Sequence, residues 1–266
     1  MLFSSLASKL NPRMRKRAIE VGWLLQTNHA SFVWDSPKPY QRKEKHSGDA
    51  KSLSHCPAVN DFEAKLVEVP CPFDLHLGIS YKTDSTVDIV NRKGEGSGIV
   101  SSVLSKLLIL SPQSQWRDPK RPVFQIRTPY TFLSDDVVYM SQLPPFMEYG
   151  TSKWPGLVVG GRFPIHVWPR NLNWAFEWHD TGQDLVLERG QPWFYCRFET
   201  SRPQQSIRLV EAAMTPPVKE YLSGIEGVAG YTAKTFSLFS VAQKRRPQQL
   251  LFKIDRNNSS RSNVTS

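Results

Sequence analysis

The sequence predicts a mainly β protein: an antiparallel β-sandwich or jelly-roll-like fold with a few short helices and basic N- and C-terminal extensions. Apolar and polar residues alternate in about eight or nine short segments between residues 72 and 214, which is the period of a strand. Gly, Pro, Asn and Asp residues separate these segments, and stretches with helical periodicity are scarce. Strands in this number and at this spacing are typical of a sandwich, a jelly roll or an open barrel.

The cleanest alternation lies at residues 73–81, where apolar side chains from Phe73 to Tyr81 occupy every second position. Further strands are predicted at residues 87–90, 123–128, 136–143, 162–168, 173–179, 184–188, 193–198 and 206–214. Helices are predicted around residues 15–26 and at 58–67, 217–223 and 232–246. Pro57 suits the first turn of a helix and Pro247 ends one, because proline lacks the N–H that a helix interior needs.

The block at residues 154–198 contains five of the eight tryptophans. Within it, Trp174, Phe176 and Trp178 alternate with other residues and are expected to share one core face. Loops of about two to five residues separate its four predicted strands, which indicates an antiparallel meander. Pro164 lacks the N–H of a ladder hydrogen bond, so the first of the four strands is expected at a sheet edge.

Positive charge is concentrated at the two ends of the chain. Residues 1–50 hold nine Lys/Arg and four Asp/Glu, and residues 241–266 hold six and one, so each end has a net charge of +5. The two ends account for the whole net charge of +10, and the middle is neutral. The sequence therefore predicts a basic extension at 1–54, a β-sandwich domain at 55–226, and a C-terminal helix with a disordered basic tail at 227–266.

Basic ends beside a neutral core favour contact with an acidic surface: nucleic acid, an anionic membrane or an acidic partner. Lys244, Arg245 and Arg246 are the binding candidates in the C-terminal helix. The alternative is that the charged ends only keep the chain solvated. No apolar run is long enough for a transmembrane segment. Three cysteines without a disulfide framework, and an N-terminus without a secretory apolar core, indicate a reducing compartment and no classical signal peptide.

No nucleotide-binding loop or nucleophile signature stands out, and no cofactor is expected. The nearest approach to a metal site is His166 and His179 on consecutive predicted strands, with Glu177 as a carboxylate beside them. Such groups could converge as in a cupin-type site. The alternative interpretation is that both histidines lie on a solvent-facing sheet.

The tryptophan-rich block also offers a candidate binding surface. Trp168 and Trp193 lie near turns and beside prolines, where they could line a groove for a ligand or a carbohydrate. A stacking platform for nucleic acid needs basic residues among the aromatic ones, and Arg170 is one of several in this block. The alternative is that these aromatic side chains belong to the core.

Several motifs follow one another along residues 55–200: Cys56-Pro57-Ala58 with Asp61, VPCPFDL at 69–75, Trp168-x-Arg170-x-Leu172-x-Trp174, and Arg189-Gly190-x-Pro192. In these motifs the chain resembles an uncharacterised family encoded by bacteriophages and marine bacteria. The resemblance implies a phage or phage-like origin and a β-sandwich fold, and it carries no catalytic residues.

The function expected from the sequence is a non-enzymatic structural or binding protein, phage-encoded, that acts in assembly or partner binding through its basic arms. A protein partner or self-association is expected, in the host cytoplasm or on a virion. Two alternatives stay open: a cupin-like metal-dependent enzyme acting on a small molecule, and a carbohydrate-binding module.

Overall fold

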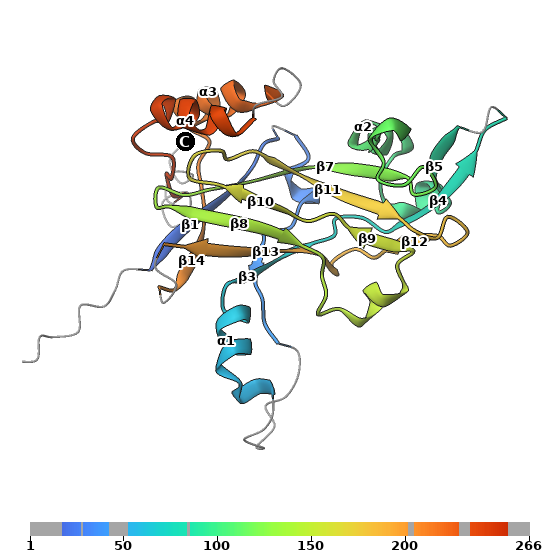
Figure 1. Ribbon diagram of the computed structural model, residues 1–266, viewed down its shortest axis with the longest axis horizontal. Coiled ribbons are helices and arrows are strands. Elements are labelled where there is room, and N and C mark those ends of the chain that lie inside the picture. The colour runs from blue at the N-terminus through green and yellow to red at the C-terminus, as the bar shows by residue number, and fades with distance from the viewer. Residues whose placement is uncertain are drawn as a thin grey trace, which may run out of the picture.

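Two β-sheets pack face to face in the computed structural model; helices cover the outer side of one, and a single short helix protrudes on the far side of the other (Figure 1). The structure describes residues 18–27, 29–42, 53–83, 86–201, 205–228 and 235–254. Helices α3 (Pro216–Ile225) and α4 (Thr235–Arg245) lie over one sheet, and α1 (Pro57–Glu63) lies on the far side of the other. The predicted class, a mainly β fold of the sandwich type with short helices, is confirmed.

Sheet A, the larger sheet, has six strands within the described residues. They are β1 Ile19–Leu25, β6 Leu108–Leu110, β7 Val123–Leu133, β9 Gly156–Val158, β11 Asn171–Trp178 and β14 Ile207–Glu211. Their order is β14-β1-β7-β11-β9, and β6 also pairs with β7. All neighbours are antiparallel except β1 and β14, which are parallel.

Sheet B faces sheet A, and a small third sheet extends the sandwich at one end (Figure 1). In the described chain, sheet B consists of β2 Lys38–Pro39, β3 Leu66–Pro70, β8 Val138–Leu143, β10 Gly161–Pro164 and β13 Pro192–Thr200, in the order β10-β8-β13-β3-β2. The third sheet consists of β4 Leu75–Tyr81, β5 Val87–Asn91 and β12 Leu185–Leu187, in the order β12-β4-β5.

The remaining helices are short. Helix α2 (Ser101–Leu107) lies beside sheet A, and single 3-10 turns occur at Ser31–Val33, Leu53–His55, Gly94–Ser97, Gln113–Gln115 and Tyr149–Lys153. None of the helices in the described ranges is long and apolar enough to cross a membrane.

The main core fills the space between sheets A and B. Trp174, Phe176 and Trp178 share the inner face of β11 and are fully buried, as the alternation predicts. The ring of Phe124 on β7 contacts all three, with centroids 5.7 to 5.9 Å apart. Trp193 of β13 approaches from sheet B, with its ring 5.5 Å from that of Trp174. The tryptophan-rich block therefore forms much of the interior.

A second apolar cluster lies between the outer face of sheet A and the helices α3 and α4. Leu24 and Leu133 contribute from the sheet, and Leu250 and Leu251 from the chain after α4. Gly22 on β1 lies directly below this segment, where an added Cβ would be 2.9 Å from a Leu133 methyl group and closer still to Leu251. Glycine thus leaves room at this position for the Leu251 and Leu133 methyl groups to pack against the strand.

The helix predicted around residues 15–26 is wrong, because Ile19–Leu25 forms β1 inside sheet A. Val21 and Trp23 point into the main core, while Leu24 points into the second cluster. A strand that is buried on both faces reads as a continuous apolar run and loses its alternation. Part of the predicted extension at 1–54 is thus a strand of the sheet, and residues 1–17 and 43–52 lie outside the described residues.

The predicted meander of four strands is also wrong, because no two of these strands pair with each other. Strand β10 pairs with β8, β11 with β7 and β9, β12 with β4, and β13 with β3 and β8. The first of them ends at Pro164, after which residues 165–167 form a turn. It does lie at the edge of sheet B, as Pro164 indicates.

The described C-terminal part packs on the rest of the fold. Helix α4 occupies most of the predicted helix at 232–246, and the chain after it packs on sheet A, where Lys253 bridges to Ala212. This segment precedes the predicted disordered stretch at 254–266, and its residues Leu250 and Leu251 are buried under apolar neighbours. Residues 255–266 lie outside the described part of the chain.

Candidate functional site

An open groove of about 820 Å³ runs between α4 and the edge of sheet B that β10 and β8 form. It brings together His166 and Lys244, two residues that the sequence predicts for different roles, and it adds Arg162 and Tyr139. The other lining residues are Pro164, Val167, Phe239, Ser240 and Gln243. None of the described residues that line this His166 groove is acidic, so it is a cationic and partly apolar hollow.

The turn after β10 holds His166 in place. The Val167 and Trp168 amides both donate to the Pro164 carbonyl, at 3.0 and 2.7 Å. The Nδ1 atom of His166 lies 2.9 Å from the Val138 carbonyl oxygen. A carbonyl oxygen only accepts, so Nδ1 carries the hydrogen and Nε2 keeps a lone pair.

The surroundings of His166 favour its neutral form. Burial lowers the pKa of His166 below its ordinary value, the bond to the Val138 carbonyl opposes this, and the nearby charge of Arg246 lowers the pKa further. The ring also packs edge-on against Tyr139, with centroids 5.5 Å apart. At neutral pH the groove therefore contains a hydrogen-bond acceptor at Nε2 beside its cations.

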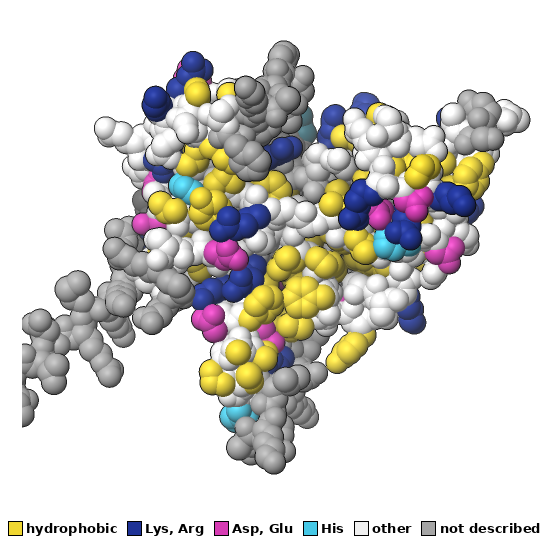
Figure 2. Space-filling view, in the orientation of Figure 1, with side chains coloured by type: hydrophobic (Ala, Val, Ile, Leu, Met, Phe, Trp, Pro, Cys, Tyr) yellow, Lys and Arg dark blue, Asp and Glu magenta, His cyan; other side chains and the backbone are white. Residues whose placement is uncertain are grey.

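Arg162 forms the rim of the groove on sheet B. Its guanidinium carbon lies 3.9 Å from the centre of the Tyr139 ring, and its Nη2 atom lies 3.0 Å from a Glu199 carboxylate oxygen. The other oxygen of Glu199 pairs with Arg197 at 3.0 Å. Lys/Arg and Asp/Glu side chains alternate down this face of the molecule (Figure 2). Glu199 thus holds the Arg162 guanidinium over the Tyr139 ring, and Arg197 holds Glu199.

The basic cluster at the end of α4 divides among three environments. Lys244 is exposed in the His166 groove, and no acidic side chain of the described residues pairs with it. Arg245 is exposed on the other side of α4, where it lines a cavity of about 500 Å³ with Trp168 and Tyr221. Of the three basic residues at the end of α4, Lys244 is therefore the one that lines the groove with His166.

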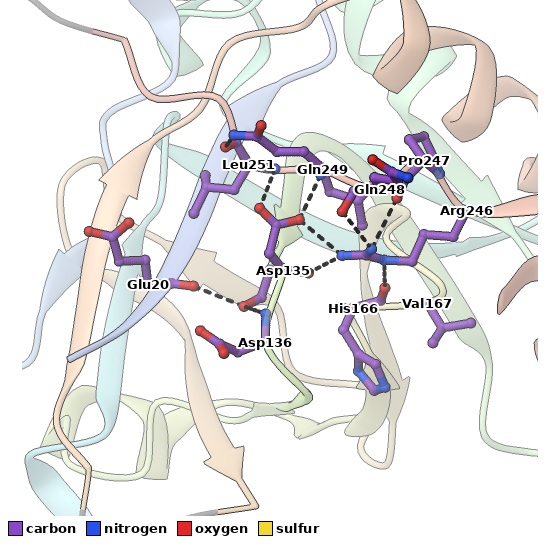
Figure 3. Close-up of polar contacts among 12 residues, drawn as sticks. Glu20, Asp135, Asp136, His166, Val167, Arg246, Pro247, Gln248, Gln249 and Leu251 are labelled. Atoms are coloured by element: carbon purple, nitrogen blue, oxygen red, sulfur yellow. Dashed lines mark hydrogen bonds and ion pairs between the residues drawn. The ribbon is translucent and has the colours of Figure 1, made fainter. Parts of the chain in front are cut away.

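Arg246 does not belong to a solvated basic arm, which corrects its predicted binding role. Its side chain is 12% exposed, and its Nη2 atom pairs with Asp135 at 2.9 Å. The guanidinium also donates to the backbone carbonyls of His166, Pro247, Gln248 and Ser134. Asp135 in turn accepts from the Leu250 and Leu251 amides (Figure 3). We call this set of contacts the Arg246–Asp135 clamp; it fixes the chain after α4 to the His166 turn and to the turn between β7 and β8.

The two tryptophans predicted to line a ligand groove are both buried. Trp193 is 1% exposed and lies in the main core. Trp168 is 7% exposed and packs its ring edge-on against Phe239 of α4, with centroids 5.3 Å apart. Trp193 is therefore no surface residue, and Trp168 lines the cavity that it shares with Arg245.

The predicted metal constellation does not form. His179 Nε2 lies 3.1 Å from a Glu177 oxygen, but the other Glu177 oxygen is bound by both Nε and Nη2 of Arg117, at 2.7 and 2.6 Å. His166 lies before β11 and His179 just after it, at opposite ends of a strand about 25 Å long at roughly 3.3 Å per residue. Within the described residues, no three His, Cys, Asp or Glu side chains could hold a metal.

Arg170 lies apart from the His166 groove. It is exposed at the start of β11 and lines a polar cavity on the outer face of sheet A, together with Arg127 and Asn171. The tryptophan-rich block does not predict that Arg170 and Arg127 line one cavity, because Arg127 belongs to β7, which lies outside that block.

The folded state stabilises the neutral form of His166, which predicts a pH dependence. Because its folded pKa is lowered, the unfolded chain binds the proton more readily, so this contribution to stability falls as pH drops through the ordinary value of 6.5. We expect the melting temperature of the wild type to fall more than that of His166→Asn between about pH 7.5 and about pH 5.5. Circular dichroism measures both. His55→Asn, at an exposed histidine, is the control and should keep the wild-type pH dependence.

Searches for similar proteins give no identification: no family model and no curated protein matches the chain.

Proposed function

We propose that the protein is a non-enzymatic binding protein that holds an acidic, partly apolar segment of a protein partner in the His166 groove. One observation carries this proposal: Arg162 and Lys244 line a groove of about 820 Å³ without a carboxylate among its described lining residues. Glu199 already pairs with Arg162 at 3.0 Å, whereas Lys244 has no acidic partner among the described residues. A partner carboxylate would supply that partner, because charge-assisted hydrogen bonds to Lys and Arg are among the strong polar contacts.

The other lining groups suit a polypeptide. Pro164, Val167 and Phe239 offer apolar contacts for a side chain beside the carboxylate. The neutral His166 accepts a hydrogen bond at Nε2, and a backbone N–H of the partner is a suitable donor. A segment in which acidic and apolar residues alternate meets all three requirements.

Nucleic acid fits the groove less well. Binding of single strands needs open aromatic faces on which bases stack. Tyr139 and Phe239 both line the groove, but the guanidinium of Arg162 already covers the Tyr139 ring at 3.9 Å, and the Phe239 ring packs against Trp168. The two cations also fall short of the long basic track that a phosphate backbone requires.

This proposal keeps the binding role expected from the sequence. It assigns that role to Lys244 and Arg162 in the His166 groove, in place of the basic ends of the chain as a whole. Assembly, phage origin and a place in the host cytoplasm or on a virion stay predictions from the sequence. The carbohydrate and metal alternatives lose support, since Trp193 is buried and His166 lies apart from His179 and Glu177.

Fluorescence anisotropy with a labelled peptide of alternating Asp and Leu tests the proposal. We expect saturable binding to the wild-type protein, and we expect Lys244→Glu to weaken it about ten-fold or more, since one charge-assisted contact is lost and one repulsion is added. Lys106→Glu on α2 is the matched control, because it makes the same charge change at an exposed site outside the groove.

Two results would contradict the proposal. Equal weakening by Lys244→Glu and Lys106→Glu would mean that the peptide senses only the net charge of the protein. Binding of a labelled single-stranded oligonucleotide that Lys244→Glu weakens, without binding of the peptide, would assign the groove to nucleic acid instead.

A further inference from the structure

The outer face of sheet A carries a second recess, independent of the His166 groove. It lies between α3 on one side and α2 on the other, over the middle of β7 and β11 (Figure 1). One cavity of about 310 Å³ lies on the α3 side, and one of about 480 Å³ lies on the α2 side. Both are lined by Gln26, Arg127, Thr128 and Asn171, so the two cavities adjoin at these four residues as the two halves of the recess.

The half on the α3 side is cationic. Arg127, Arg170 and Glu226 line it, so two positive charges stand against one negative charge, and neither arginine forms an ion pair with an acidic side chain of the described residues. Arg127 stands between the buried residues Ile126 and Thr128, in a central strand of the sheet. A guanidinium in that position has no structural partner to explain it, and it offers a fork of donors to an anion.

The amides around these cations are held in place with their donors available. Gln26 Nε2 donates to the Thr131 hydroxyl at 2.9 Å, and that hydroxyl donates to Asn171 Oδ1 at 2.7 Å. Because Oδ1 of Asn171 is the acceptor in this chain, its Nδ2 group remains as a donor toward the recess. The Arg127 and Arg170 guanidinium groups and Asn171 Nδ2 thus provide donors of one kind, as an oxyanion requires.

The half on the α2 side is apolar. Trp34, Phe73, Ile99, Val103 and Leu107 line it, and its volume lies within the range of small-molecule sites. Such sites are lined mainly by apolar and aromatic side chains, with a few polar groups that fix the orientation of the ligand. The recess has this composition, with the polar groups gathered at one end.

We infer that this recess binds a small amphiphilic anion: a flat or branched apolar body under α2, joined to a phosphate or carboxylate that Arg127 and Arg170 bind. The two halves together provide about 790 Å³, from about 310 and about 480 Å³, which is enough for a bicyclic ring and its anionic group. This site is separate from the proposed peptide groove and does not depend on it.

Isothermal titration calorimetry on the full chain tests the inference with four probes: naphthyl phosphate, naphthoate, naphthol and inorganic phosphate. We expect naphthyl phosphate or naphthoate to bind at least ten-fold more tightly than naphthol and inorganic phosphate, because only the joined ligand fills both halves. The stronger of the two anions identifies the natural head group as phosphate or carboxylate.

Two exposed arginines supply the variant and its control. Arg127→Gln removes the charge without removing a described hydrogen bond, so we expect the variant to fold normally. We expect its affinity for the anionic probe to fall at least ten-fold, while its affinity for naphthol stays unchanged. Arg121→Gln makes the same change in an exposed loop away from the recess and should bind as the wild type does.

Three results would overturn the inference. Binding of naphthol as tightly as the anions would make the recess a purely apolar cavity. An equal loss of affinity for the anionic probe in Arg127→Gln and Arg121→Gln would mean that only the net charge of the protein matters. No binding of any probe at millimolar concentration, with a folded protein by circular dichroism, would mean that no amphiphilic anion of this size enters the recess.

Discussion

Replacing Trp174 with alanine is expected to lower the free energy of unfolding by about 3–5 kcal/mol, the range for truncation of a buried aromatic side chain. Trp174 is fully buried and its ring meets those of Phe124, Trp154 and Phe176, at 5.9, 6.0 and 5.4 Å. Its Nε1 atom also donates to the Trp193 carbonyl at 3.3 Å. The change leaves a cavity at the centre of the sandwich and removes contacts to both sheets.

Urea denaturation followed by far-ultraviolet circular dichroism measures this loss without relying on tryptophan fluorescence. Phe32→Ala is the matched control, because Phe32 is 98% exposed and should change the free energy of unfolding by less than about 0.5 kcal/mol. A Trp174→Ala midpoint equal to that of Phe32→Ala would show that the tryptophan-rich block is not the core.

The fold class could be predicted because several strands have one apolar face. In β11, Trp174, Phe176 and Trp178 point inward while Asn173 and Ala175 are only half-buried, so the period of two survives in the sequence. β1 and the second half of β7, by contrast, are buried on both faces. There the alternation disappears, and the prediction gave a helix in one case and an early strand end in the other.

Strand pairing could not be predicted, because it depends on contacts between distant segments. Short loops favour hairpins, yet β12 joins β4 across more than a hundred residues and β10 and β11 enter different sheets. The turn after Pro164 causes this separation, since it directs the chain from sheet B to sheet A. Local turn residues are present at this point but do not say which sheet follows.

The sequence located the candidate site only in part. Lys244 and Arg246 are two residues apart and have the same type of charge, yet one lies in the groove and the other in the clamp. Tyr139 and Arg162 were not predicted to face His166, because their pairing depends on β8 lying beside β10. Arg127 did carry a local signal, since it is the one charged residue in β7.

Asp135→Ala is expected to lower the free energy of unfolding by about 2–3 kcal/mol, because it leaves charged and backbone donors without an acceptor. The Asp135 carboxylate accepts from Arg246 at 2.9 Å and from the Leu250 and Leu251 amides at 2.6 and 3.3 Å. These leucines cover the second apolar cluster, so their release exposes the outer face of sheet A. Thermal unfolding measures the loss, and limited trypsin digestion should cut sooner after Lys244 and Arg245.

Asp136→Ala separates the clamp from a general effect of charge. The neighbouring Asp136 is exposed, and its carboxylate makes no hydrogen bond or ion pair in the described structure (Figure 3). Both changes remove one negative charge, so only the contacts of Asp135 distinguish them. If the two variants unfold and digest alike, the clamp contributes nothing. If Asp135→Ala alone is destabilised and also binds the acidic peptide more weakly, Arg246 acts as a positioning residue: it holds the His166 turn and α4 so that Lys244 faces Arg162 across the groove.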